Sequence, residues 1–174
     1  MGEAERSRPT VQCSRLLCGD AKLGREAIGR VKIGGSKPWP SLEFMRAFLA
    51  DRDHILIVAT EGEQPIGFAL AYLLDRVDGG RRMALFYEIE VAEAHRRCGA
   101  GRRMVETLKS VCSAEGVGKM WVQTSPSNDA AVALYRSTGA RAKGNEGDTV
   151  FAYSFEGSGG RQPSKEAGCR PSSG

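Results

Sequence analysis

The spacing of apolar positions changes several times along the chain, and each change marks a predicted element. Residues 54–60 and 66–74 are compact apolar runs separated by a short polar turn, which is typical of two antiparallel strands joined as a hairpin. After a turn at residues 78–80, aromatic and branched side chains over 83–91 partly alternate with charged ones, which predicts another strand. Because short turns join successive strands, these three should form a meander.

Helical spacing is found on both sides of the meander. Residues 20–28 and 41–49 repeat apolar side chains at helical intervals, with Asp20 and Ser41 as expected N-caps. A weaker apolar stretch over 11–17 predicts a first strand before these two helices.

Downstream of the meander, helices and strands alternate. Residues 102–117 and 128–137 have helical spacing, while 120–124 and 150–155 have the composition of strands. We therefore expect an α/β (α+β) fold, with a central mixed, mostly antiparallel sheet of six to seven strands flanked by about four helices.

Length and composition are those of one domain. A chain of 174 residues with 41% apolar content can bury a core of its own, and we expect that single domain to span residues 11–156. Residues 1–10 are polar and expected to be flexible. Residues 157–174 contain Gly, Ser and Pro without apolar periodicity, so we expect a disordered tail.

Charge and cysteine content disfavour several classes of protein. The net charge of +4 comes from 25 basic residues spread among 21 acidic ones, which does not indicate a nucleic-acid-binding protein. No apolar run approaches the roughly 18 residues of a membrane helix, and the N-terminus has no apolar signal core. We therefore expect a soluble, cytoplasmic protein. The five cysteines lack CxxC spacing and only two histidines accompany them, which favours free thiols and no metal site.

The segment after strand 83–91 is rich in glycine and arginine. Gly99 and Gly101 allow the backbone to approach a ligand, and a helix that begins there points unpaired N–H groups outward. Phosphate binds at such helix ends, and four nearby arginines would add positive charge: Arg96, Arg97, Arg102 and Arg103. An ordinary strand-to-helix connection is the alternative, whereas a P-loop is disfavoured because the GK[ST] ending is absent.

The order of the motifs is more specific than any one of them. They follow one another as Arg96-x-x-Gly99-x-Gly101 after a strand that ends in valine, one further strand, Asn128-x-x-Ala131-x-x-Leu134-Tyr135, and Gly139. Over residues 55–155 this arrangement resembles the GCN5-related N-acetyltransferase (GNAT) superfamily. The resemblance implies the GNAT fold, with a V-shaped splay between the fourth and fifth strands.

Acetyl-CoA is the cofactor that the resemblance implies. In that family the glycine turn binds the pyrophosphate through backbone amides, and the strand before it pairs with the pantetheine arm. The residues that the resemblance assigns to acetyl-CoA are Ile89, Glu90, Val91, Arg96, Arg97, Cys98, Gly99, Ala100, Gly101, Arg102 and Asn128. A homodimer is common among such proteins and would be compatible with this chain.

A closer resemblance is to the small aminoglycoside 3-N-acetyltransferases of the GCN5-related type. It rests on residues 86–91, 93–97 and 129–135, which are similar to a tyrosine–acid–aliphatic segment, an EHRR segment and an AVALY helix in those enzymes. The chain departs from them at Glu88, where aspartate is expected, at Glu90, where a small residue is expected, and at Asn128, where an acid is expected. The resemblance implies acetylation of an aminoglycoside antibiotic at a primary amine, and hence antibiotic resistance.

The chemistry of acetyl transfer limits which side chains can take part. An amine that attacks a thioester must be neutral, so a base has to take its proton, and the departing thiolate gains from a proton donor. We expect Glu88, beside the cofactor strand, to act as the base and Tyr135 as the acid in a direct transfer. The alternatives are that Glu88 is a solvated strand residue and that Tyr135 only packs in the core.

The acceptor is harder to identify than the reaction. A polycationic acceptor requires several carboxylates around its pocket, and the candidates are Glu88, Glu90, Asp129, Glu146 and Asp148. A peptide or protein amine and a small polyamine are alternative acceptors. A non-catalytic acyl-CoA-binding protein is the alternative from another class, but the presence of both Glu88 and Tyr135 favours an enzyme.

Overall fold

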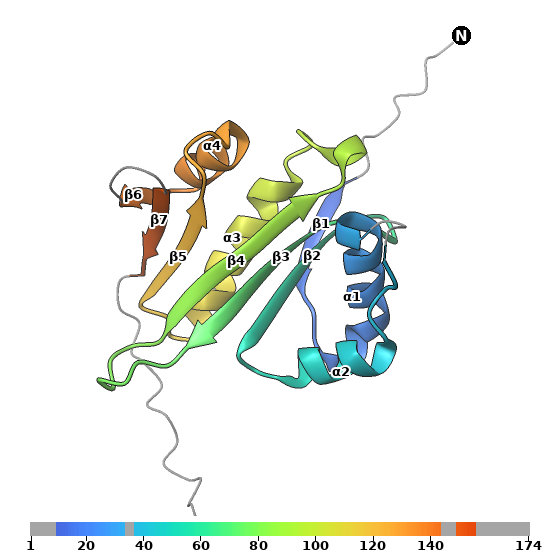
Figure 1. The fold of residues 1–174 in the computed structure, drawn as a ribbon, viewed down its shortest axis with the longest axis horizontal. Helices are drawn as coiled ribbons and strands as arrows, with labels where there is room; N and C mark the ends of the chain where they lie inside the picture. The colour runs from blue at the N-terminus through green and yellow to red at the C-terminus, as the bar shows by residue number, and fades with distance from the viewer. Residues whose placement is uncertain (1–9, 34–36, 144–148, 156–174) are drawn as a thin grey trace, which may run out of the picture.

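One mixed sheet runs through the whole molecule. A computed structural model describes residues 10–33, 37–143 and 149–155, and its seven strands are ordered β1-β2-β3-β4-β5-β7-β6 (Figure 1). The strands are β1 (Val11–Arg15), β2 (His54–Glu61), β3 (Gln64–Leu74), β4 (Met83–Val91), β5 (Lys119–Thr124), β6 (Arg141–Lys143) and β7 (Thr149–Ser154). Every pair of neighbours is antiparallel except β4 and β5, which confirms the expected mixed, mostly antiparallel sheet.

Helices cover both faces of this sheet. Helix α1 (Ala21–Ala27), its π-helical continuation η2 (Ile28–Ile33) and α2 (Leu42–Ala50) lie on one face. Helix α3 (Ala100–Ala114) lies on the other, where α4 (Asp129–Ser137) also contributes to the core. Short 3-10 turns, η1 (Cys18–Asp20) and η3 (Glu93–His95), precede α1 and the glycine turn. Within the described ranges, no helix is both long and apolar enough to cross a membrane.

The alternation of side chains along the strands divides the core in two. The cluster under α1 and α2 contains Leu56, Val58, Phe68 and Leu70, whereas the cluster under α3 contains Ile55, Ile57, Ile66 and Phe86. Because successive strand residues point to opposite faces, the two apolar runs of the hairpin supply both clusters at once. This explains why residues 54–60 and 66–74 are almost continuously apolar instead of alternating.

The predicted helix starts are largely confirmed. Ser41 Oγ accepts a hydrogen bond from the Phe44 N–H at 3.0 Å, as expected of an N-cap. Asp20 precedes α1, but its carboxylate accepts from the Leu17 N–H instead and does not cap the helix. The first helix also continues five residues beyond Ile28, as the π-helical η2.

The parallel contact between β4 and β5 is short. The strands pair at three positions only, Met83 with Lys119, Ala84 with Met120 and Leu85 with Trp121. Beyond Leu85, β4 stays paired with β3 and β5 stays paired with β7, so the two strands diverge (Figure 1). The register of β3 and β4 shifts by one residue at Tyr87, which increases the local twist. The predicted V-shaped splay is therefore confirmed.

Close packing of η2 predicts a specific weak point. A Cβ added at Gly29 would overlap the indole ring of Trp39, whereas one added at Gly19 would meet nothing within 4 Å. We expect Gly29→Ala to lower the free energy of unfolding by about 1–3 kcal/mol, because the ring has to shift. Gly19→Ala should leave stability nearly unchanged in the same denaturant titration. Equal effects of the two substitutions would contradict this packing.

Candidate active site

Two neighbouring carboxylates project from β4 toward the face covered by α1 and α2. Glu88 pairs with Leu70 and Glu90 with Phe68 across β3, and both apolar partners belong to the core cluster on that face. The two acids therefore share one face of the strand. Burial raises the pKa of Glu90, and the hydrogen bond and charge of Glu88 raise it further. The two acids therefore interact directly with each other.

Lys32, in the helical layer that covers this face of the sheet, places a cation next to the pair. Its ammonium group donates hydrogen bonds to both carboxylate oxygens of Glu88 and forms an ion pair with them. Lys32 lies on η2, the π-helical extension of the first helix, so this contact depends on the extension. The positive charges of Lys32 and Arg96 oppose the rise in the pKa of Glu90.

An apolar pocket of about 170 Å³ opens beside the ion pair. Eight of its lining residues are apolar, namely Ile28, Pro40, Phe44, Met45, Phe48, Leu56, Phe68 and Leu70, and the remaining two are Lys32 and Glu88. Phe44 is 57% exposed and lies at the solvent-facing part of this lining. The pocket is therefore suited to an apolar group whose polar end lies at Glu88.

The glycine turn has the backbone geometry of an anion site. Gly99 has a φ of 86° and precedes α3. The Arg103 N–H donates to the Gly99 carbonyl at 3.0 Å, and the N–H groups of residues 100–102 precede this hydrogen bond at the start of the helix. No side chain caps this helix end, so those N–H groups point out of the helix. Arg97 also has a positive φ, 66°, and its side chain is exposed. Backbone donors and exposed guanidinium groups together fit a pyrophosphate.

Three elements meet at Gly101. A Cβ added there would lie 3.5 Å from the Leu134 side chain of α4 and 4.0 Å from the Val91 side chain at the end of β4. The glycine turn, the end of β4 and α4 therefore lie close together. Two predicted cofactor residues also have partners inside the protein, since Arg102 donates to the Ser137 carbonyl at 2.6 Å and Asn128 caps α4 through the Ala131 N–H.

Tyr135 lies on the side of α4 that faces the core. It is 4% exposed, and its ring meets Phe86 edge-on and Phe151 at a tilt, with centroids 5.8 and 5.5 Å away. Burial raises the pKa of the Tyr135 phenol to about 12, so the hydroxyl keeps its proton at neutral pH. This protonated state is what a proton donor requires, and the ring contacts also fulfil a packing role.

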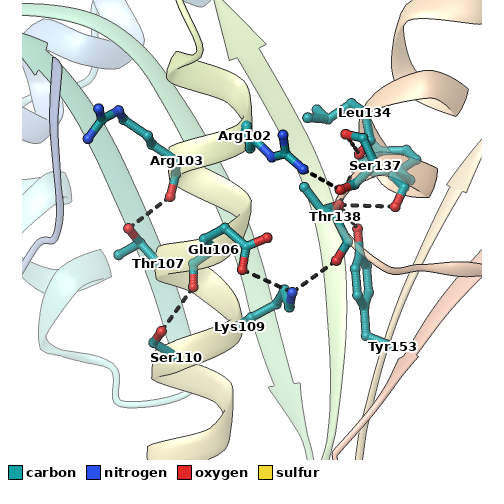
Figure 2. A network of polar contacts seen from close by, with 11 residues as sticks. Arg102, Arg103, Glu106, Thr107, Lys109, Ser110, Leu134, Ser137, Thr138 and Tyr153 are labelled. Carbon is teal, nitrogen blue, oxygen red and sulfur yellow. Dashed lines mark hydrogen bonds and ion pairs between the residues drawn. The ribbon is translucent and has the colours of Figure 1, made fainter.

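A polar network holds α4 against α3 (Figure 2). Lys109 donates to the Thr138 carbonyl at 2.9 Å and to Glu106, while the Thr138 hydroxyl bonds the Leu134 and Tyr135 carbonyls and the Tyr153 hydroxyl. Thr138 is buried, so these bonds satisfy a group that would otherwise be costly to bury. The network fixes the end of α4 and with it the position of Tyr135.

Not all predicted acidic residues converge. The structure brings Glu88 and Glu90 together, but Asp129 is exposed in the first turn of α4 and does not line the pocket. Glu146 and Asp148 lie outside the described residues. Lys32 was not anticipated, because a lysine at the end of an amphipathic stretch has no sequence signal that distinguishes it from a solvated one.

Residues 26–140 match the model of the Acetyltransferase (GNAT) family. The chain is 33% identical over 137 residues to the N-alpha-acetyltransferase RimI of Mycobacterium tuberculosis (strain ATCC 25618 / H37Rv), covering 77% of this chain and 80% of RimI.

Two similar solved structures are aminoglycoside acetyltransferases from uncultured soil metagenomic samples. One, meta-AAC0020 in complex with sisomicin, aligns with a TM-score of 0.70 at 20% identity, over 78% of this chain and 91% of that one. The other, HMB0005, aligns with a TM-score of 0.67 at 26% identity, over 80% of this chain and 97% of that one.

The family match extends over most of the elements that form the candidate site. Residues 26–140 include η2 and α2 beside the pocket, the strands that splay, and the turn that begins α3. The order of motifs in the sequence predicted the same relationship, and this chain belongs to the Acetyltransferase (GNAT) family.

Proposed function

We propose that this protein is an acetyl-CoA-dependent N-acetyltransferase that transfers the acetyl group directly to a primary amine held at Glu88. The observation that carries the proposal is the place of Glu88, which lies both in the lining of the apolar pocket and on the part of β4 that has left β5. An acceptor in the pocket would thus have its amine next to the strand that the cofactor arm is expected to follow.

The edge of β4 that β5 leaves free and the start of α3 would together hold acetyl-CoA, which would supply the acetyl thioester. Because β4 pairs with β5 only at residues 83–85, the backbone groups of residues 89–91 that point away from β3 have no partner on β5 and could bond the amides of a pantetheine arm, although the Val91 carbonyl also accepts a hydrogen bond from Arg96 Nε at 3.4 Å. The N–H groups at the start of α3, with Arg96 and Arg97 nearby, would hold the pyrophosphate.

The proton transfers of the reaction would involve Glu88, Glu90 and Tyr135. A carboxylate at Glu88 can accept the proton of the acceptor amine, and Glu90 beside it can share that proton because its own pKa is raised by burial and by Glu88. Tyr135, protonated at neutral pH, can donate to the departing thiolate. No covalent enzyme intermediate is needed.

The acceptor class best supported is the free N-terminal amine of a peptide or protein. The pocket lining is mostly apolar and contains one carboxylate that Lys32 already neutralises in part, which suits one amine next to an apolar side chain. The 33% identity with RimI, an N-alpha-acetyltransferase, points to the same class.

An aminoglycoside is the second candidate. It is favoured by the adjacent carboxylates of Glu88 and Glu90, which could bind a polycation, and by the fold similarity to the two aminoglycoside acetyltransferases. Against it, Asp129 does not line the pocket, so fewer acids gather there than a polycation requires.

An acceptor screen distinguishes these proposals. Purified protein with acetyl-CoA would receive peptides with apolar or charged first residues, the same peptides with blocked N-termini, and gentamicin, while thiol release and product mass are recorded. We expect acetylation of peptides that have a free N-terminus and an apolar first residue. Peptides with a blocked N-terminus should not be acetylated. Acetylation of gentamicin alone would select the second candidate, and no transfer to any amine would overturn the proposed function.

Gly99 tests the phosphate site. A valine at a φ of 86° is strained and would displace the N–H groups that precede α3, so Gly99→Val should raise the dissociation constant of CoA about tenfold or more. The control is Gly79→Val, which carries similar strain at a φ of 72° in the turn between β3 and β4. Calorimetry should show the loss for Gly99→Val alone; equal losses would assign both effects to general strain.

Tyr135 tests the proton donor. Tyr135→Phe keeps the ring contacts with Phe86 and Phe151 but removes the acidic proton, so kcat should fall about a hundredfold while the dissociation constant of CoA changes little. Tyr153→Phe removes another buried hydroxyl and should mainly lower stability. A kcat of Tyr135→Phe close to that of the unmodified protein would leave Tyr135 a packing residue only.

A further inference from the structure

Lys32 occupies the place at Glu88 where an acceptor amine is expected. Its ammonium group bonds both oxygens of the carboxylate, and among the described residues that line the pocket it is the one basic side chain. An acceptor with a primary ammonium group would need the same two oxygens. We propose that Lys32 is a specificity-determining residue, whose ammonium group must be displaced from Glu88 before a cationic acceptor can bind.

The pocket offers few other partners for a second cation. Apart from Lys32 and Glu88, its lining is apolar, so an incoming ammonium group cannot be satisfied elsewhere in it. Glu90 is the neighbouring acid on β4, and burial, with the hydrogen bond and charge of Glu88, raises its pKa. Glu88 therefore holds one ammonium group well and two poorly, which makes Lys32 and the acceptor competitors.

Lys32 is able to leave its position. The side chains of Lys32 and Glu88 are 41% and 20% exposed, and the lysine has a flexible four-carbon stem that reaches water easily. Ion pairs that water can reach are weak, so displacing Lys32 costs little free energy. A ligand that also fills the apolar pocket can offset that cost. An acceptor with an apolar group gains that compensation, whereas a fully polar polycation does not.

Several charged and titratable groups surround Glu88 besides Lys32. Tyr72 of β3 and Glu90 of β4 interact with Glu88 directly, while Tyr87 acts on Tyr72 and Arg96 acts on Glu90. From the helical layer, Lys32 is the charged residue among the described residues that line the pocket. Replacing it thus changes the charge of the pocket without altering the strand that holds the acids.

The test compares an amine with its neutral analogue. We would titrate 1-hexylamine and 1-hexanol into the CoA-bound protein and follow the dissociation constants by NMR, because both probes have the same apolar chain and binding is read without turnover. For Lys32→Met we expect the hexylamine constant to fall about two- to fivefold and the hexanol constant to stay unchanged. Lys32→Arg, which keeps a cation at Glu88, should bind hexylamine no better than the unmodified protein does.

Control variants keep the outcome clear. Lys22→Met removes an exposed lysine of α1 away from the pocket and should alter neither constant. If Lys32→Met does not retain the spectrum of a folded protein, Lys32→Gln replaces it. Hexylamine binding that is unchanged or weaker in the Lys32 variant would overturn the inference, as would an equal gain for hexanol.

This inference rests on the proposed function, but its failure is distinguishable. Loss of the proposed function would appear as a lack of acetyl transfer in the acceptor screen. Competition at Glu88 would appear in the binding constants whether or not transfer occurs.

Discussion

The early end of pairing between β4 and β5 is the constraint on which the candidate site depends. Three parallel residue pairs join the strands, and after Leu85 the backbone of β4 has a partner on one side only. Unpaired backbone donors and acceptors inside a protein are costly unless a ligand or water satisfies them. The fold therefore keeps a strand edge in its centre that is suited to an extended ligand with amide groups.

The charges along this strand edge match the proposed chemistry. At one end, the glycine turn and exposed arginines follow β4 and precede the positive end of α3. Along the strand, Glu88 and Glu90 face the apolar pocket on the α1 and α2 side. Tyr135 lies on the opposite face, where the network around Thr138 and Lys109 fixes α4 (Figure 2). The proton acceptor and the proton donor would thus approach the opening from different layers.

Much of this arrangement follows from local sequence. The apolar runs of the hairpin, the Ser41 cap and the glycine turn each depend on neighbouring residues, and the structure has them where the sequence predicts them. Contacts between distant segments could not be predicted in this way. The ion pair between Lys32 and Glu88 joins residues 56 positions apart and requires a π-helical extension that periodicity does not reveal. The predicted convergence of five acids also depended on contacts between distant segments. Among the described residues, Glu88 and Glu90 are the two acids that come together.

The two parts of the candidate site differ in what specifies them, since one depends on the backbone and the other on side chains. The proposed cofactor site depends on backbone geometry: a strand that loses its partner, a positive φ at Gly99 and the start of a helix. Many sequences can provide that geometry, so structures as low as 20% identical share the fold. The acceptor pocket is formed by side chains, including Phe44, Phe48 and Lys32, whose replacement changes shape and charge without disturbing the sheet. Under the proposed function, residues on η2 and α2 would decide the acceptor, and their apolar character favours a peptide amine over a polycation.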